Sequence, residues 1–114
     1  MKMTHSLDQR LLTAASYVTK GGIPADIGCD HAYLAAELIK TDKCRRVIAS
    51  DIKQGPLDAA AKTVEKSGVK EKVELVLSDG LENISLNGVS DVVIAGMGGE
   101  TIADIIDRCV GLCN

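Results

Sequence analysis

Aromatic residues are almost absent from this 114-residue sequence, which contains two Tyr, no Phe and no Trp. Apolar residues still make up 46% of the chain, so a core has to be built from aliphatic side chains. The length suits one domain rather than two. Basic residues number 13 against 16 acidic ones, and the net charge of −3 excludes a small module that binds nucleic acid by overall positive charge alone.

Paired cysteines and long hydrophobic runs are also lacking. The four cysteines, Cys29, Cys44, Cys109 and Cys113, form no CxxC pair and have no zinc-like spacing with histidine. Cys109 and Cys113 are one helical turn apart, which is only a weak metal-binding pattern, so we expect reduced thiols and no metal. No apolar run approaches the roughly 20 residues of a membrane span, and residues 1–10 lack the apolar segment of a signal peptide. We therefore expect a cytoplasmic protein that does not enter a membrane.

Helical and strand-like patterns alternate along the chain, which predicts a parallel α/β sheet. Asp30 is expected to cap the second helix, and Gly68 to close the third in a left-handed conformation. Strand 72–79 has a partly polar face and is therefore placed nearer an edge of the sheet. The predicted order is helix 6–19, strand 23–28, helix 31–40, strand 46–51, helix 55–67, strand 72–79, a short helical or irregular link near 80–89, strand 91–96 and a helix from about 99.

Acidic residues and glycines stand where the four predicted strands end. The first strand ends in Asp26-Ile27-Gly28, the second in Asp51, the third in Asp79-Gly80 and the fourth in Gly96-Met97-Gly98-Gly99. In an open parallel α/β sheet, ligands bind beyond the carboxyl ends of the strands, so we expect these residues to share one site. Each also has an ordinary explanation, since Asp30 could serve only as a helix cap, Asp79 only in a turn and the glycines only in a tight loop.

The chemistry of these residues favours a cationic ligand over a dinucleotide. A carboxylate that closes the second strand, Asp51, suits a ribose because it can accept hydrogen bonds from both hydroxyls. Dinucleotide sites use the pattern GxGxxG, but Gly28 is followed by Asp30 and Tyr33 at the second and third glycine positions. Asp30 would repel a pyrophosphate and attract the sulfonium and ammonium groups of S-adenosyl-L-methionine. An NAD-linked oxidoreductase and a non-catalytic cofactor-binding fragment are the alternative interpretations.

Several stretches of the sequence resemble one known family. ADIGCDHAYL (25–34), ASDIKQGPL (49–57), SDGL (78–81), IAGMGGETI (94–102) and LDQRLLTAASYV (7–18) are similar to the bacterial tRNA (adenine(22)-N(1))-methyltransferases, the TrmK family. The resemblance covers residues 7 to 106 and implies a Rossmann-like class I methyltransferase fold. It also implies S-adenosyl-L-methionine as the methyl donor and N1 of an adenine in tRNA as the acceptor.

The resemblance further implies roles for individual residues. Asp26, Gly28 and Asp30 are placed in the cofactor loop, Asp51 at the donor ribose, Asp79 and Gly80 at the donor adenine, and Gly96, Met97 and Gly98 beside the reacting methyl group, with Ile52 as a further cofactor-binding residue. Asp30 is expected to stabilise positive charge on the methylated base, with His31 as a second catalytic candidate that orients it. Arg10, Tyr33 and Gly99 are candidates for contact with the tRNA. The alternatives are a solvent-facing residue in a first helical turn for His31 and a core or rim residue for Tyr33.

The sequence departs from this family in its C-terminal part. The family fold has more strands than the four predicted here, and its C-terminal helical part has no counterpart in the sequence. We therefore expect residues 1–114 to form a single, truncated methyltransferase domain whose apolar fourth strand, 91–96, self-associates. The basic residues Lys40, Lys43, Arg45 and Arg46 are expected at the end of the sheet opposite the ligand site, as solvated surface, with an RNA contact as the alternative.

Overall fold

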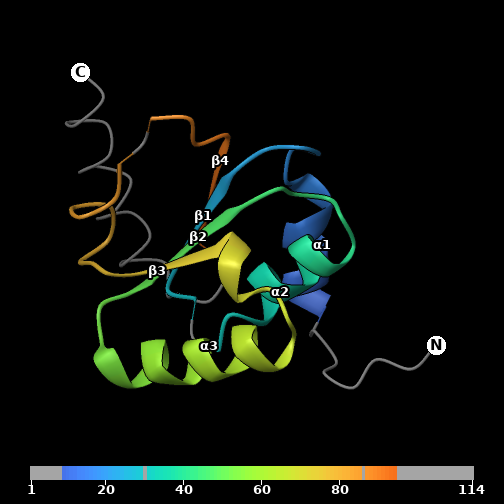
Figure 1. Ribbon diagram of the computed structural model, residues 1–114. Helices are drawn as coiled ribbons and strands as arrows, with labels where there is room; N and C mark the ends of the chain where they lie inside the picture. Colours follow the sequence, from blue (N-terminus) through green and yellow to red (C-terminus); the bar gives the residue numbers. More distant parts are fainter. Residues whose placement is uncertain (1–8, 30, 86, 95–114) are drawn as a thin grey trace.

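Helices and strands alternate in the computed structural model, which describes residues 9–29, 31–85 and 87–94. This alternation confirms the predicted α/β organisation (Figure 1). The elements are α1 (Gln9–Tyr17), β1 (Pro24–Ile27), α2 (Tyr33–Lys40), β2 (Val47–Asp51), α3 (Gln54–Lys66), the 3₁₀ turn η1 (Lys70–Lys72), β3 (Val73–Leu77) and β4 (Asp91–Val93).

The four strands form one parallel sheet in the order β3-β2-β1-β4. Strand β1 lies inside the sheet, where Asp26 is opposite Ala49 of β2 on one side and Val93 of β4 on the other. Strand β3 lies at an edge, as its partly polar face predicts, and its last residue, Leu77, is opposite Asp51 of β2. The carboxyl ends of β1, β2 and β3 therefore adjoin one another.

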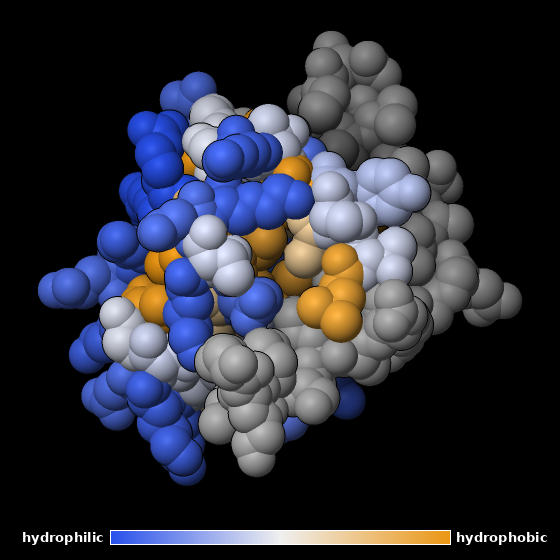
Figure 2. Space-filling model, turned by 90° about the vertical axis from the view of Figure 1, so that its right-hand side faces the viewer, coloured by the Kyte–Doolittle hydropathy of each residue, from blue (hydrophilic) through white to orange (hydrophobic). Residues whose placement is uncertain are grey.

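The three α-helices of the described residues pack on one face of the sheet (Figure 1). The core between them is aliphatic, with Leu34 and Leu38 of α2, Leu57 of α3 and Val47 of β2 all buried. A second, smaller cluster lies on the other face, where Ala25, Ile27, Leu81 and Ile84 are buried. Away from the core, the face shown in Figure 2 is largely hydrophilic, with small hydrophobic patches between hydrophilic side chains.

The end of α3 shows how a single glycine sets a helix boundary. Gly68 has a φ of +74°, which confirms the predicted left-handed cap. Its N–H donates to Glu65 O at 3.1 Å and the N–H of Val69 donates to Val64 O at 3.0 Å, which together form a Schellman motif. Val64 and Val69 are both buried, so the same turn also extends the core.

The start of α2 differs from the prediction. The helix begins at Tyr33 rather than His31, and its N-cap position is Ala32, which has a φ of +61° and makes no side-chain capping bond. The prediction that Asp30 occupies the N-cap is therefore wrong, because the chain makes a turn at His31 and Ala32 before the helix starts. Asp30 itself, residues 6–8 of the predicted first helix and the helix expected from 99 lie outside the described residues.

Candidate functional site

Asp26 and Asp51 are the two acids at the centre of the sheet. Asp26 is only 5% exposed, and Asp51 lies two residues beyond Ala49, the residue opposite Asp26, so both side chains project from the same face. Burial, and then the nearby Asp51 charge, raise the pKa of Asp26 to about 7. A carboxyl group that exchanges its proton near neutral pH, at the end of a central strand, is typical of a functional site.

The loop after β1 is held against β2 by its backbone. The N–H groups of Gly28 and Cys29 both donate to Ser50 O, at 2.9 Å and 2.8 Å. Gly28 has a φ of +73°, in the left-handed region that favours glycine, so the chain can turn sharply away from the strand there.

His31 and Tyr33 lie together just beyond this loop. Their rings stack with centroids 5.2 Å apart and planes inclined by 9°. His31 is exposed, in keeping with the solvent-facing alternative, although it lies in a turn and not in the helix. Tyr33 is half-buried in the first turn of α2.

Asp51, the last residue of β2, accepts hydrogen bonds from two other segments of the chain. The Asp51 carboxylate accepts a hydrogen bond from the N–H of Lys53 at 3.1 Å, and Asp51 O accepts one from the N–H of Ser78 at 2.9 Å. Asp51 is half-buried, whereas Ile52 is 56% exposed. The second bond fixes the segment that carries Asp79 beside Asp51.

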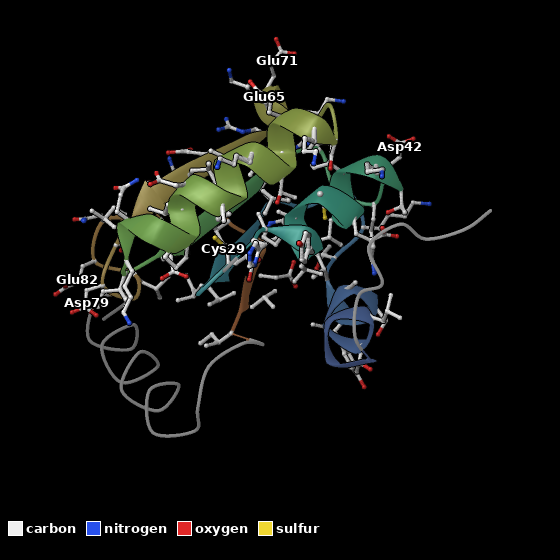
Figure 3. All side chains as sticks on the ribbon, turned by 90° about the horizontal axis from the view of Figure 1, so that it is seen from below. Cys29, Asp42, Glu65, Glu71, Asp79 and Glu82 are labelled. Atoms are coloured by element: carbon white, nitrogen blue, oxygen red, sulfur yellow. The ribbon has the colours of Figure 1, made fainter. Side chains whose placement is uncertain are left out.

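The turn after β3 contains two residues that the sequence analysis did not select. Ser78 Oγ donates to Gly80 O at 2.8 Å and accepts from the N–H of Asn83 at 3.0 Å. Asn83 Nδ2 donates to Leu77 O at 2.9 Å. Asp79, between them, is exposed and lies near Glu82 at the end of the molecule where α3 begins (Figure 3). The signal that could have found this turn is a Ser at a strand end followed by Asp-Gly.

The structure therefore brings together part of the predicted site. Asp26, Gly28, Asp51, Ile52, Asp79 and Gly80 lie at or just beyond three adjoining strand ends. Arg10 lies in the first turn of α1. The predicted site residues Asp30, Gly96, Met97, Gly98 and Gly99 lie outside the described residues.

The basic residues lie at the other end of the sheet, as expected. Arg45 and Arg46 directly precede β2, at its amino end. Arg46 pairs with Glu74 at 3.2 Å, and both side chains are more than half exposed. Lys43 Nζ donates to Ala15 O, near the end of α1, so two of the four cations already have partners within the chain.

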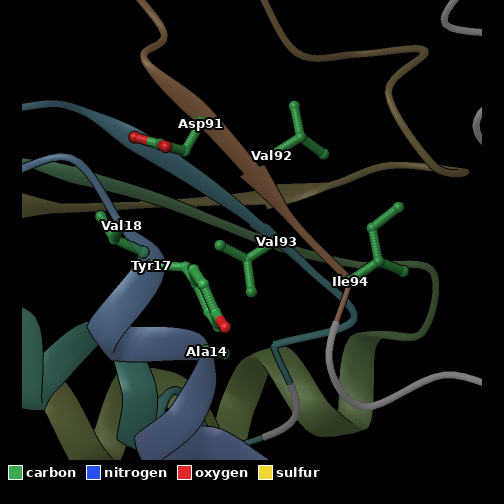
Figure 4. Close-up of a pocket in the computed structure, with 7 residues that line it drawn as sticks. All are labelled: Ala14, Tyr17, Val18, Asp91, Val92, Val93 and Ile94. Atoms are coloured by element: carbon green, nitrogen blue, oxygen red, sulfur yellow. The ribbon is translucent and has the colours of Figure 1, made fainter.

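A pocket of about 270 Å³ lies between α1 and β4, lined by Ala14, Tyr17, Val18 and residues 91–94 (Figure 4). Asp91, at one end, accepts hydrogen bonds from the N–H of Thr19 at 3.1 Å, from Thr19 Oγ1 at 3.2 Å and from Ser90 Oγ at 2.6 Å. The Ser90 bond, followed by those from Thr19, holds the pKa of Asp91 below its usual range, although desolvation opposes the shift. Because its carboxylate is satisfied from within the chain, we interpret Asp91 as a structural link between α1 and β4.

The described part of the chain contains neither a metal-binding cluster nor a membrane-spanning helix. No group of three or more His, Cys, Asp and Glu side chains there is arranged to hold a metal ion. Among the same residues, no helix has both the length and the apolar character required to span a membrane.

Comparison with known proteins agrees with the fold and with the sequence motifs. The family model described as a methyltransferase domain matches residues 7–113. A tRNA (adenine(22)-N(1))-methyltransferase of Bacillus subtilis is 42% identical over 101 residues, which are 89% of this chain and 42% of that protein. The chain thus spans less than half the length of this relative.

Solved structures give the same result. TrmK of M. capricolum, in complex with the cofactor product S-adenosyl-homocysteine, superposes with a TM-score of 0.83 at 39% identity, over 91% of this chain and 47% of that one. The B. subtilis M1A22 tRNA methyltransferase TrmK superposes with a TM-score of 0.85 at 41% identity, over 90% and 44% of the two chains.

These similarities extend over the strand ends that carry the acids and confirm the resemblance that the sequence motifs indicate. The parallel sheet with its flanking helices is Rossmann-like, and the family model covers nearly the whole sequence. The chain belongs to the methyltransferase domain family.

Proposed function

We propose that this chain is the donor-binding part of an S-adenosyl-L-methionine-dependent tRNA methyltransferase that modifies N1 of adenine 22. The observation that carries the proposal is the buried Asp26, beside Asp51, at the carboxyl ends of the central strands. The proposal is also supported by the 42% sequence identity to a tRNA (adenine(22)-N(1))-methyltransferase. We further propose that residues 1–114 form one incomplete domain and that this domain needs neither a metal nor a membrane. Because its substrate is tRNA, we propose that it acts in the cytoplasm.

The described residues fit S-adenosyl-L-methionine by their chemistry. The ligand is cationic at its sulfonium and ammonium groups and has no phosphate, so an acidic strand edge attracts it and would repel a dinucleotide. In this proposal Asp26, Gly28 and Asp30 bind near its charged groups, and Asp51 and Ile52 hold the ribose. Asp79 and Gly80 bind the adenine, while Gly96, Met97 and Gly98 line the space beside the methyl group.

The bound donor would supply an electrophilic methyl group, and the protein supplies position and charge. Adenine N1 has a free lone pair, so no proton has to leave before it attacks, and the protein needs no general base for that step. Positioning and electrostatic stabilisation are then the main contributions of the chain. Asp30 is proposed to stabilise the positive charge of the methylated base and to accept a hydrogen bond from its exocyclic amine, with His31 orienting the base.

The tRNA side of the site is proposed from the exposed groups near the loop. N1 of a paired adenine is hidden, so the base has to be extruded before it can react. The stacked His31–Tyr33 pair, at the edge of the cofactor loop, offers an aromatic surface for such a base. Arg10, in the first turn of α1, and Gly99 are proposed as further contacts with the RNA.

Asp51→Ala tests the donor site. A carboxylate that accepts from ribose hydroxyls makes charge-assisted hydrogen bonds, so its loss should weaken donor binding by roughly 1–3 kcal/mol. The measurement is the dissociation constant of S-adenosyl-L-methionine by titration calorimetry for the parent and the variant. An unchanged dissociation constant would remove Asp51 from the site.

Transfer to RNA is tested with tritium-labelled donor and two tRNA transcripts that differ only in adenine or guanine at position 22. The proposal expects label in the adenine transcript alone. Donor binding without any transfer would instead favour a non-catalytic cofactor-binding fragment, and binding of NAD in place of the donor would favour the oxidoreductase alternative.

A further inference from the structure

The turn that follows β3 is braced by two of its own side chains. Ser78 Oγ bridges Gly80 O and the N–H of Asn83, at 2.8 Å and 3.0 Å. Asn83 Nδ2 reaches back to Leu77 O, the last carbonyl of the strand, at 2.9 Å. The turn is thus closed on itself around Asp79 by three hydrogen bonds that involve side chains.

The same turn is anchored to the sheet and to the core. The N–H of Ser78 donates to Asp51 O at 2.9 Å, so the turn keeps a fixed position beside the end of β2. Ser78 is 3% exposed, and Leu81 and Ile84 are buried in the cluster on the second face of the sheet. Asp79 is the exposed acid of this turn, and Figure 3 shows it at the strand-end side of the molecule, near Glu82.

We propose that Ser78 and Asn83 are positioning residues that aim the Asp79 carboxylate at the base of the donor, and that this turn sets the selectivity for adenine. The inference rests on the proposed function, because it assumes that a nucleoside lies along the strand ends with its ribose at Asp51. In that proposal the base of the ligand binds at Asp79 and Gly80, just beyond the end of β3.

The selectivity follows from the hydrogen-bonding groups of the two purines. A carboxylate accepts a hydrogen bond from the exocyclic amine of adenine, whereas hypoxanthine presents a carbonyl oxygen at that position and repels it. Hydrogen bonds weaken steeply when their angle is poor. If the turn lets Asp79 move, the chain should therefore lose its preference for the adenine ligand while keeping most of its affinity for both ligands.

Asn83→Ala tests the inference with two ligands, S-adenosyl-homocysteine and its analogue with hypoxanthine in place of adenine. The parent chain should prefer the adenine form, and the variant should lose roughly 5- to 10-fold of that preference, the scale of a weakened charge-assisted hydrogen bond. Affinity for the hypoxanthine form should change little. Asn87→Ala is the matched control, because Asn87 is an exposed asparagine of the same connection whose backbone N–H, rather than its side chain, bonds Ser85 Oγ.

Ser78→Ala should have the same effect as Asn83→Ala, and Ser78→Thr, which keeps the hydroxyl, should restore the preference. Because Asn83 is exposed, its variant remains informative if loss of the buried Ser78 hydroxyl prevents folding. Equal weakening of both ligands by Asn83→Ala would show a merely structural role and overturn the inference. A parent chain that binds both ligands equally would overturn it while leaving the proposed function in place, and a parent that binds neither would overturn both.

Discussion

Asp26 combines a titratable group with nearly complete burial, so its protonation affects folding as well as ligand binding. Its folded-state pKa is about 7, against an ordinary value of 3.8. The folded chain therefore holds a proton on this group between about pH 4 and pH 7 that the unfolded chain has already released. The contribution of Asp26 to the free energy of unfolding therefore falls as the pH rises through that window and is constant above it. A cationic ligand next to the ionised Asp26 would restore part of the stability that is lost.

Asp26→Asn should remove the pH dependence that this residue contributes. Relative to the parent, the variant should gain stability as the pH rises from about 4 to about 8, by up to about 4 kcal/mol if the whole pKa difference is realised. Urea unfolding of both proteins across this range measures the effect.

Asp42→Asn is the matched control for the loss of one negative charge, since Asp42 is exposed. If the difference in the free energy of unfolding between the Asp26→Asn variant and the parent stays constant with pH, the raised pKa assigned to Asp26 is contradicted. In that case the folded and unfolded chains would release the Asp26 proton over the same range.

At the scale of single elements, the helices and strands were predictable because their apolar periods agree with the observed burial. Gly68 ends α3 as predicted, since a left-handed position with a buried residue after it has a clear local signature. The start of α2 was not predictable in the same way. There Ala32, a residue with no local preference for the left-handed region, takes the cap position because the loop between β1 and α2 is held to Ser50 by tertiary hydrogen bonds.

The candidate site was predictable to a similar extent. Acids at strand ends are visible in the sequence, and Asp26, Asp51 and Asp79 do lie at adjoining ends. The sequence does not show that Asp26 is buried, because burial depends on helices that pack from elsewhere in the chain. The turn after β3 could be read from Ser78-Asp79-Gly80, but the brace could not, because it depends on Asn83, five residues further on, which carries no distinctive pattern.

The join between α1 and β4 gives a prediction about two glycines. A Cβ at Gly22 would lie 2.2 Å from Ser90 Oγ and 2.8 Å from Ser90 Cβ, and Ser90 Oγ also accepts the N–H of Ile23 at 2.9 Å. Gly22→Ala should therefore destabilise the chain by roughly 1–3 kcal/mol, as overpacking does elsewhere. Gly55→Ala is the matched control, because its Cβ meets nothing within 4 Å and lies in the first turn of α3.

Gly55→Ala should instead stabilise the chain by about 0.5 kcal/mol through helix propensity. Thermal unfolding of the two variants compares them directly. A Gly22→Ala chain as stable as the parent would mean that Ser90 can move without loss, and that it does not fix the end of α1.

At the scale of the whole molecule, the described sheet has two edges of different character. Strand β3 carries the charged Glu74, which pairs with Arg46, and its exposed apolar residue, Leu77, is the last of the strand. In β4 the middle residue, Val92, is apolar and has 41% of its surface exposed. A charged residue protects a strand edge from pairing with another chain, and an apolar edge does not. We therefore propose that self-association of this chain uses β4.

Light scattering over a range of concentrations tests this proposal. The apparent mass should rise above the 12.0 kDa of one chain, and Val92→Lys should restore that value at all concentrations. Leu77→Lys is the matched control, because Leu77 is 48% exposed on the opposite edge strand and its change should leave the association intact. A parent chain that stays at the mass of one copy, or equal effects of the two lysines, would exclude β4 as the contact.

The position of β1 between β2 and β4 also has a consequence for synthesis on the ribosome. The hydrogen bond from Ile23 to Ser90, next to the β1–β4 pairing, joins residues 67 apart in the chain. A nascent polypeptide that has reached β3 can pair β1 with β2 but still leaves the other side of β1 bare. Contacts of this sequence separation slow folding, so the emerging chain should depend on chaperones until β4 has left the exit tunnel.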